Sequence, residues 1–338
     1  MPINHQDFIK NSTTFKFHLS NILPSNIQVT SVGNIIVLDS SYIIIRDKDD
    51  LSNFVFGHVE SGETLTEALT RESIEEAGVS IQNEHLLGYI LCNKLKNTDT
   101  NIKYQDISII PIYISFVKKI VSKELSFETK GRELLSYKKA RAILEKRDDN
   151  KQLLNILIEA EEFIKGLYSK LNFDYKGIEI LDVPITQVFN FCVNKDSKFC
   201  LVRDYEEQHF SLPGGGCELS ENFFECCTRE TREEAQLEIS EIEIMGVIQL
   251  DYLDKNGYIL QSVQHVRCCS TYSETKEFVP GKNGFEIEER IFCDFEELNN
   301  YVVWLQFDSG KLILENVKNY MSCRLWKIVI KSSLQIIS

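Results

Sequence analysis

The sequence lacks the features of a membrane or secreted protein. No apolar run reaches the roughly 20 residues that a membrane-spanning helix requires, and the opening stretch MPINHQDFIKNSTTF lacks the basic-then-apolar order of a secretory leader. No two of the ten cysteines form a C-x-x-C pair, which argues against a zinc ribbon. We therefore expect a cytoplasmic protein, with no membrane partner, whose cysteines are buried as small hydrophobic residues.

The sequence also lacks an excess of basic residues. It has 37 Lys and Arg against 51 Asp and Glu, a formal charge of −14. A protein that grips long DNA or RNA needs clustered positive charge, so this balance argues against such a partner. It is compatible with a small phosphorylated ligand whose charge a bound cation neutralises locally. The sequence leaves open whether the chain forms a homo-oligomer.

The chain contains an internal repeat. Gly57 and Gly215 are 158 residues apart (215 minus 57), and many identical residues share this offset. A period this long indicates two copies of a whole domain, and 338 residues suit two domains at about 150 residues each. Further pairs at the same offset are Glu63 and Glu221, Arg71 and Arg229, Glu72 and Glu230, Glu75 and Glu233, Glu76 and Glu234, Gly88 and Gly246, and Arg132 and Arg290.

We place the two domains at residues 27–168 and 175–338. Residues 1–26 precede the repeat as an extension with no counterpart in the second copy, and their sequence leaves open a short packed helix or an arm. In each copy, short apolar runs alternate with segments of helical periodicity, which predicts an α/β layered domain.

Each copy contains a helix with crowded acidic residues. Thr64 and Glu67 form a T-x-x-E capping box at its start, and Asn222 and Glu225 take the same places in the second copy. Three glutamates then follow at spacing i, i+3 and i+4, on one side of one helical turn. The simplest interpretation is a solvent-exposed acidic face of the helix. The alternative is a bound cation that cancels the repulsion, since carboxylate oxygens suit Mg²⁺ or Mn²⁺.

These residues resemble the Nudix box, G-x5-E-x7-R-E-U-x-E-E-x-G-U, in which U is apolar. The first copy, Gly57 to Val79, carries all seven fixed identities. A chance match has a probability on the order of 10⁻⁸ per starting position, given ordinary residue frequencies. The second copy, Gly215 to Leu237, carries six, because Gln236 replaces the last glycine. That glycine is expected to end the helix in a left-handed conformation.

The resemblance implies a fold and a reaction. The fold is two consecutive Nudix-type α/β/α sandwiches with mixed sheets, and the protein would be a metal-dependent pyrophosphohydrolase. Its substrate would be a small nucleoside diphosphate linked to another moiety, attacked by water at a phosphoric anhydride bond. The alternatives are a nucleotide sensor that binds without cleaving, or one catalytic and one regulatory domain.

The resemblance also implies roles for single residues. Arg71 would pair with Glu63, and Arg229 with Glu221, to orient the helix. The glutamates would be catalytic and bind Mg²⁺ or Mn²⁺ together with a glycine carbonyl, through Gly57, Glu72, Glu75 and Glu76 in one copy and Gly215, Glu230, Glu233 and Glu234 in the other.

Two further groups of residues are candidates for the site. The resemblance also implies a catalytic acid outside the box, for which the candidates are Glu128 and Glu286, each preceded by Phe at the repeat offset, with Glu288 and Glu289 as competitors to Glu286; an ordinary surface glutamate is the alternative for each. Arg46 and Arg203 end equivalent apolar runs, and each either meets a substrate phosphate or pairs with an acidic neighbour.

Overall fold

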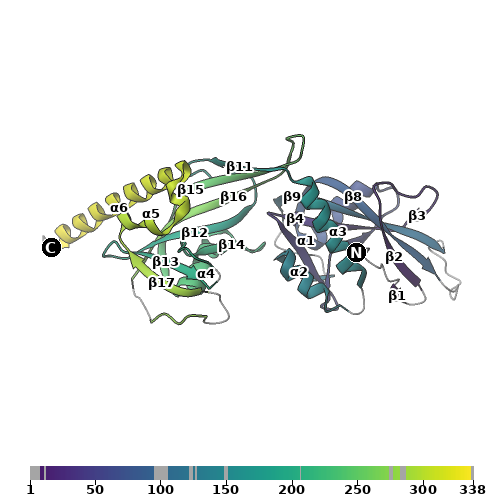
Figure 1. Ribbon diagram of the computed structural model, residues 1–338, viewed down its shortest axis with the longest axis horizontal. Helices are drawn as coiled ribbons and strands as arrows, with labels where there is room; N and C mark the ends of the chain where they lie inside the picture. Colours follow the sequence, from purple (N-terminus) through teal and green to yellow (C-terminus); the bar gives the residue numbers. More distant parts are fainter. Residues whose placement is uncertain are drawn as a thin grey trace. The chain divides into compact units, whose positions relative to one another are not determined.

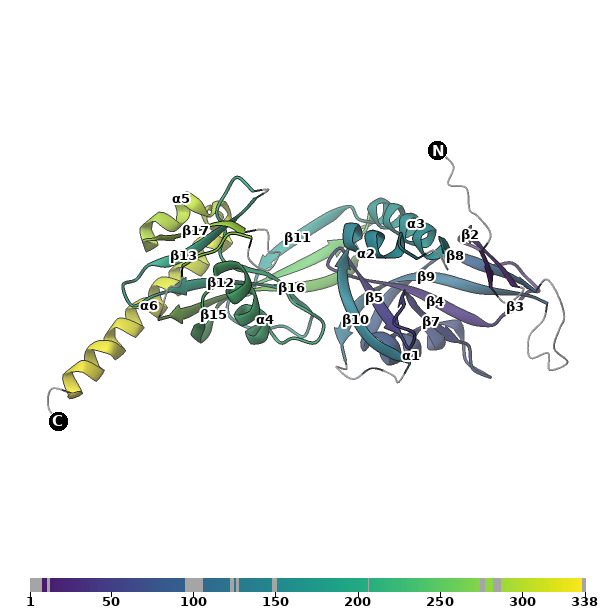
Figure 2. The same cartoon turned by 90° about the horizontal axis from the view of Figure 1, so that it is seen from below.

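The protein divides into two compact units (Figures 1 and 2). In this computed structural model, the described residues are 8–10, 13–94, 106–121, 125, 128–147, 151–205, 207–273, 277–281 and 287–335. Unit 1 contains Met1–Asn172 and Asp251–Ser262, and unit 2 contains Phe173–Leu250 and Val263–Ser338. The segment Asp251–Ser262, which lies within the second repeat, thus belongs to unit 1.

Unit 1 is built on a mixed ten-stranded sheet of order β1-β2-β8-β9-β4-β5-β10, to which β3, β6 and β7 add through β9, β5 and β4. The pair β4–β9 is parallel, whereas β8–β9 and β4–β7 are antiparallel. The strands are β1 (Phe8–Lys10), β2 (Thr13–Leu19), β3 (Gln28–Val29), β4 (Ser31–Leu38), β5 (Ser41–Asp47), β6 (Ser52–Asn53), β7 (Val55–His58), β8 (Val79–Lys94), β9 (Ile107–Ile120) and β10 (Thr129–Ser136).

Helices cover both faces of this sheet. The helix of the first box is α1 (Leu65–Ala77), and the opposite face carries α2 (Tyr137–Leu144) and α3 (Lys151–Leu167), as Figure 2 shows. The core lies between the sheet and these last two helices, where Ile112 and Phe116 of β9 pack with Ile156 of α3. Apolar residues on both faces explain why β4 is buried along nearly its whole length.

Unit 2 repeats the plan with a seven-stranded sheet of order β11-β15-β16-β12-β13-β17, in which β14 pairs with β12 and β12–β16 is parallel; residues 170–172, 251–253 and 259–262 of its strands belong to unit 1. Its elements are β11 (Lys170–Tyr175), β12 (Ile185–Val193), β13 (Phe199–Asp204), β14 (Gly214–Gly216), α4 (Phe223–Glu230), the π-helical turn η1 (Thr231–Ala235), β15 (Ile239–Leu253), β16 (Ile259–Tyr272), β17 (Ile287–Cys293), the 3-10 turns η3 (Phe295–Glu297) and η4 (Val303–Gln306), α5 (Leu298–Tyr301) and α6 (Asp308–Gln335). Both units are thus α/β/α sandwiches with mixed sheets, as expected.

The N-terminal extension corrects one expectation. Its described part is neither a packed helix nor an arm, because Thr13–Leu19 pairs with β8 along its whole length, from Thr13 opposite Lys94 to Leu19 opposite Gly88. The alternation in TTFKFHL explains this, since period two buries one face of a strand and leaves Phe17 only 1% exposed. Strand β11 holds the corresponding edge of the second sheet, beside β15, so the extension does have a counterpart.

The ten cysteines are all free, and all but Cys323 are buried. Among the described residues, no helix is long and apolar enough to cross a membrane.

Candidate active site

Caps fix where the helix of each box begins and ends. The Thr64 hydroxyl accepts a hydrogen bond from the Glu67 amide at 3.2 Å, and the Glu67 carboxylate accepts one from the Thr64 amide at 2.8 Å. Asn222 and Glu225 form the same capping box before α4, so both predicted caps are confirmed. Helix α1 ends at Gly78 in the left-handed region (φ 63°), and Gln236 holds the same conformation (φ 54°) in the second copy.

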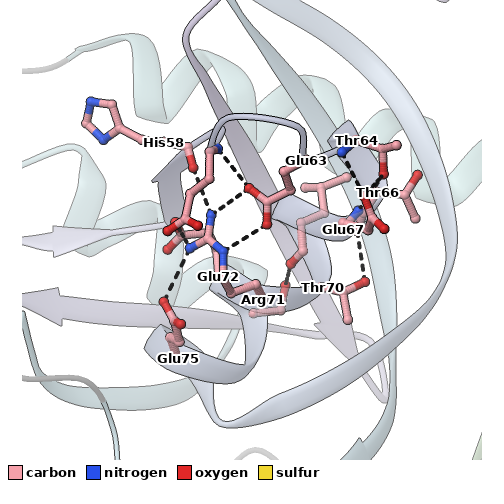
Figure 3. Close-up of polar contacts among 12 residues, drawn as sticks. His58, Glu63, Thr64, Thr66, Glu67, Thr70, Arg71, Glu72 and Glu75 are labelled. Atoms are coloured by element: carbon pink, nitrogen blue, oxygen red, sulfur yellow. Dashed lines mark hydrogen bonds and ion pairs between the residues drawn. The ribbon is translucent and has the colours of Figure 1, made fainter.

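One arginine organises the acidic residues of the first copy (Figure 3). Arg71 donates from Nε and Nη2 to the two carboxylate oxygens of Glu63, each at 2.9 Å. Its Nη1 lies 2.6 Å from Glu72, and its Nη2 donates to the His58 carbonyl at 2.8 Å. A planar fork with five donors can hold several acceptors at once. The expected pair of Arg71 and Glu63 therefore ties the loop to the helix.

The second copy repeats this network. Arg229 donates to both carboxylate oxygens of Glu221, at 2.6 and 2.8 Å, and to Glu230 at 2.7 Å. The helix itself differs, because α4 gives way after Glu230 to the π-helical turn η1, which carries Glu233 and Glu234. The predicted i, i+3, i+4 spacing therefore lies on a regular α-helix only in the first copy.

The first glycine of each box lies against the first glutamate of the helix. A Cβ atom added to Gly57 would overlap the carboxylate of Glu72, and one added to Gly215 would meet that of Glu230 at 2.8 Å. Only glycine permits so close an approach. The structure thus brings together Gly57 with Glu72, and Gly215 with Glu230, as the box pattern predicts.

The last glutamate of each trio is half-buried and held by a backbone amide. Glu76 accepts a hydrogen bond from the Phe56 amide at 3.1 Å, and Glu234 accepts one from the Gly214 amide at 2.9 Å. Burial, with a smaller contribution from neighbouring carboxylates, raises the pKa of Glu76 to about 7 and that of Glu234 to about 8, although the hydrogen bond from the backbone amide lowers each. These sites therefore concentrate negative charge where water screens it poorly.

Acidic residues outside the helix also reach these sites. The exposed Glu128 is one of the charges that raise the pKa of Glu76, and Asp204 at the end of β13 acts likewise on Glu234. Asp204 was missed from the sequence, where it only ended an apolar run. Glu286 lies outside the described residues. Glu288 and Glu289 instead pair with Arg203, at 2.9 and 2.8 Å.

Comparison with known families decides the identity of both repeats. The model described as the NUDIX domain matches residues 28–155 and again residues 184–312, which is more than half of the chain. The chain belongs to the Nudix family. It contains two Nudix domains in tandem, one in each repeat.

Solved structures of Nudix proteins each match less than half of this chain. A mutant of the Bacillus subtilis pyrophosphohydrolase BsRppH is 20% identical, with a TM-score of 0.37, and the match covers 47% of this chain and 97% of that one. An Ap4A hydrolase of C. elegans, in a binary complex, is 16% identical over 41% of this chain and 98% of that one, with a TM-score of 0.30. The dihydroneopterin triphosphate pyrophosphohydrolase of E. coli is 15% identical over 39% and 98%, with a TM-score of 0.25.

Family membership places the chain in a class of enzymes. Nudix domains are pyrophosphohydrolases, whose general reaction is hydrolysis of a pyrophosphate bond, and they generally use divalent metals such as Mg²⁺ or Mn²⁺.

The Nudix glutamates fit such a metal in their donor chemistry. They present only carboxylate oxygens, beside a glycine that approaches without a side chain, and hard cations prefer oxygen ligands. Among the described residues, no three acidic, His or Cys side chains have already converged on one point. In the first domain this follows from the contacts above, since Arg71 holds Glu72 while the Phe56 amide holds Glu76.

A cavity of about 340 Å³ adjoins the box of the first Nudix domain. Its volume lies within the range of small-molecule sites. Phe15, from the N-terminal strand β2, lines it together with residues of β7 and of the chain around the start of α3. The remaining lining residues are Ser31, Asp47, Asp49, Leu51, Asn53, Phe56, Gly57, His58, Ile90, Ile110, Arg147 and Gln152. Sequence reasoning missed Phe15, although the strand-like alternation in TTFKFHL could have indicated it.

The arginines that end the equivalent strands pair with acids. Arg46 lies 3.5 Å from Asp50 and 3.4 Å from Glu133, and Arg203 pairs with Glu288 and Glu289. The structure therefore favours the ion-pairing interpretation for both. Figure 3 shows the imidazole of His58 turned away from the glutamates, although His58 lines the cavity.

Proposed function

We propose that the Nudix domains hydrolyse a small nucleotide in which a nucleoside diphosphate is linked to another moiety, using Mg²⁺ or Mn²⁺. The observation that carries this proposal is the mutual repulsion of the buried Glu72 carboxylate and the half-buried Glu76 carboxylate, duplicated by Glu230 and Glu234. Such a concentration of negative charge is costly unless a cation compensates it.

The proposed ligands of the metal in the first domain are Glu72, Glu75, Glu76 and the carbonyl of Gly57. In the second domain they are Glu230, Glu233, Glu234 and the carbonyl of Gly215. A bound divalent ion would neutralise charge on the phosphoryl oxygens and make the attacking water more acidic. Arg71 and Arg229 position the glutamates through their bonds to Glu63 and Glu221.

The attacking water molecule must lose a proton, and a nearby basic group has to accept it. In the first domain we assign this role to Glu128, because it is exposed and close enough to Glu76 to raise the pKa of that residue. In the second domain Asp204 stands in the corresponding relation to Glu234, and Glu286 remains the candidate drawn from the sequence. A carboxylate of this kind acts as a general base for water attack at phosphorus.

The two domains differ enough to support a second candidate, in which the first is catalytic and the second regulatory. The observation in its favour is the π-helical turn η1, which holds Glu233 and Glu234 in a different helical geometry from that of Glu75 and Glu76 on α1. Turns of this kind are frequently found at functional sites. The nine buried thiols agree with the cytoplasmic location that we propose for either function.

Paired substitutions in the full chain test both candidates. Glu72→Gln with Glu76→Gln removes the charge of the first site, and Glu230→Gln with Glu234→Gln removes that of the second. The substrates are ADP-ribose, dinucleoside polyphosphates, NADH, nucleotide sugars and damaged nucleoside triphosphates, each with Mg²⁺ and Mn²⁺. We expect turnover at the altered site to fall by about 10²–10⁴.

Two exposed glutamates on equivalent strands serve as matched controls, Glu84→Gln in β8 and Glu243→Gln in β15. Loss of turnover only with the first pair of substitutions, with ligand binding kept at the second site, selects the mixed catalytic and regulatory function. Unchanged hydrolysis in both paired variants would rule out the hydrolase.

A further inference from the structure

The second Nudix domain buries an arginine that pairs with no acidic side chain among the described residues. Arg267 of β16 is only 7% exposed, and within the described part of the chain it donates one hydrogen bond, from Nη1 to the Val266 carbonyl at 3.3 Å. Among the described residues, no group accepts a hydrogen bond from its Nε. The guanidinium instead lies between two aromatic rings, 4.6 Å from the centre of Phe189 and 5.1 Å from that of Trp304.

This arginine is close to the box. Phe189 of β12 pairs with Arg267 on one side and with Gly214 on the other. The ring of Phe189 lies 3.0 Å from the place where a Cβ of Gly214 would be. The Gly214 amide in turn holds the carboxylate of Glu234 at 2.9 Å. Arg267 is therefore separated from the proposed metal ligands by one aromatic residue and one glycine.

The first Nudix domain has an uncharged residue at this place. There Gly33 of β4 pairs with Ile112 of β9 and with Phe56 of β7, in the same ladder positions as Phe189, Arg267 and Gly214. Ile112 is 1% exposed and packs in the core. The fold therefore does not require a cation at this position.

A buried cation without a counter-charge is costly, and aromatic rings offset only part of its lost hydration. Burial lowers the pKa of Arg267 to about 10, which still leaves the guanidinium charged at neutral pH. An anion beside the guanidinium would supply the missing charge and an acceptor for the Nε–H group. The arginine is thus better explained by a ligand than by the fold.

We propose that Arg267 binds an anionic group, a phosphate or a carboxylate, on the ligand of the second Nudix domain, and that the ligand of the first domain has no group in this place. This assignment rests on the proposed function for the position of the ligand. It makes Arg267 a determinant of specificity, so the two domains would select different nucleotides.

Thermal unfolding of the full chain in inorganic phosphate, without divalent metal, tests this proposal. Both tryptophans, Trp304 and Trp326, belong to unit 2, so tryptophan fluorescence follows that unit. We expect phosphate to raise the Tm of the wild type. In Arg267→Met the apparent affinity for phosphate should fall about tenfold or more, and the Tm in phosphate-free buffer should rise because the buried charge is gone.

Arg290→Met is the matched control. Arg290 also lies over two aromatic rings, but it donates a hydrogen bond to the Ala235 carbonyl at 2.6 Å. This variant should have a lower Tm and keep the response to phosphate. Arg267→Lys keeps the charge without the planar fork, and should show an intermediate affinity.

A lower Tm of Arg267→Met together with an unchanged response to phosphate would overturn the proposal, since Arg267 would then serve packing alone. An absent response in the wild type would overturn it as well. If the paired glutamine variants leave hydrolysis unchanged while Arg267 still governs phosphate binding, the proposed function fails and the anion site stands. Adenosine monophosphate in place of phosphate then shows whether the group is accepted as part of a nucleotide.

Discussion

At the scale of single residues, the two Nudix helices end in the same left-handed backbone conformation but with different residues. Gly78 takes the left-handed conformation that favours glycine. Gln236 takes it with a side chain, and its amide bonds both the carbonyl and the amide of Val279, at 2.8 and 3.2 Å. The second domain thus uses the strained residue to hold a neighbouring segment.

We predict that Gly78→Ala destabilises unit 1 by about 1 kcal/mol, because a Cβ in the left-handed region meets the backbone. Hydrogen exchange of the α1 amides in the full chain measures this. Gly166→Ala is the control, since Gly166 lies in α3 with open space around it, and alanine there should be neutral or stabilising by up to about 1 kcal/mol. Equal effects of the two substitutions would contradict the conformational explanation.

Residues fixed by local spacing were the ones that the sequence could predict. The capping boxes, the pair of Arg71 and Glu63, and the left-handed cap depend on neighbours within one loop and one helix. Phe15, Asp204 and Arg267 depend on strand register, which pairs residues far apart in the chain. One sequence does not give that register, so these residues were missed.

At the scale of elements, a glycine and a phenylalanine face each other across paired strands in both domains, but their places are reversed. The first pairs Gly33 of β4 with Phe56 of β7, and the second pairs Phe189 of β12 with Gly214 of β14. A Cβ on Gly33 would lie 2.5 Å from the ring of Phe56 and 2.6 Å from Ile112. At this pair of positions there is therefore space for one aromatic ring, which comes from β7 in the first domain and from β12 in the second.

The exchange predicts coupled effects in the first domain. Gly33→Phe alone should cost about 1–3 kcal/mol through overpacking. Combined with Phe56→Gly, it should cost less than the sum of the two single changes by about 0.5–3 kcal/mol. Urea unfolding followed by hydrogen exchange in β4 measures each variant. Additive effects would show that the two positions do not share one space.

The alternation in TTFKFHL predicts a strand, and that strand is β2, which adds a phenylalanine to the cavity wall. Its place at the edge beside β8 could not be derived, because edge pairing depends on the rest of the sheet. The π-helical turn η1 was also beyond prediction, since the second box has the same length as the first. Elements were therefore easier to predict than their partners.

At the scale of the whole molecule, the repeat predicted two domains but not how the chain divides. The segment Asp251–Ser262 belongs to unit 1, and its buried Gln261, at the start of β16, donates to the carbonyls of Val37 and Val117 at 2.9 and 3.1 Å. These carbonyls belong to β4 and β9, so a segment of the second repeat completes the hydrogen bonding of the first sheet. A simple cut between repeats would remove it.

The account depends on metal binding by both glutamate clusters, and anomalous diffraction from crystals of the full chain soaked in Mn²⁺ tests this most directly. We predict Mn²⁺ peaks beside Glu72 and Glu76 near the Gly57 carbonyl, and beside Glu230 and Glu234 near the Gly215 carbonyl. Peaks should vanish from one domain only in the paired glutamine variant of that domain. Saturating Mn²⁺ with no peak at either cluster would contradict the account.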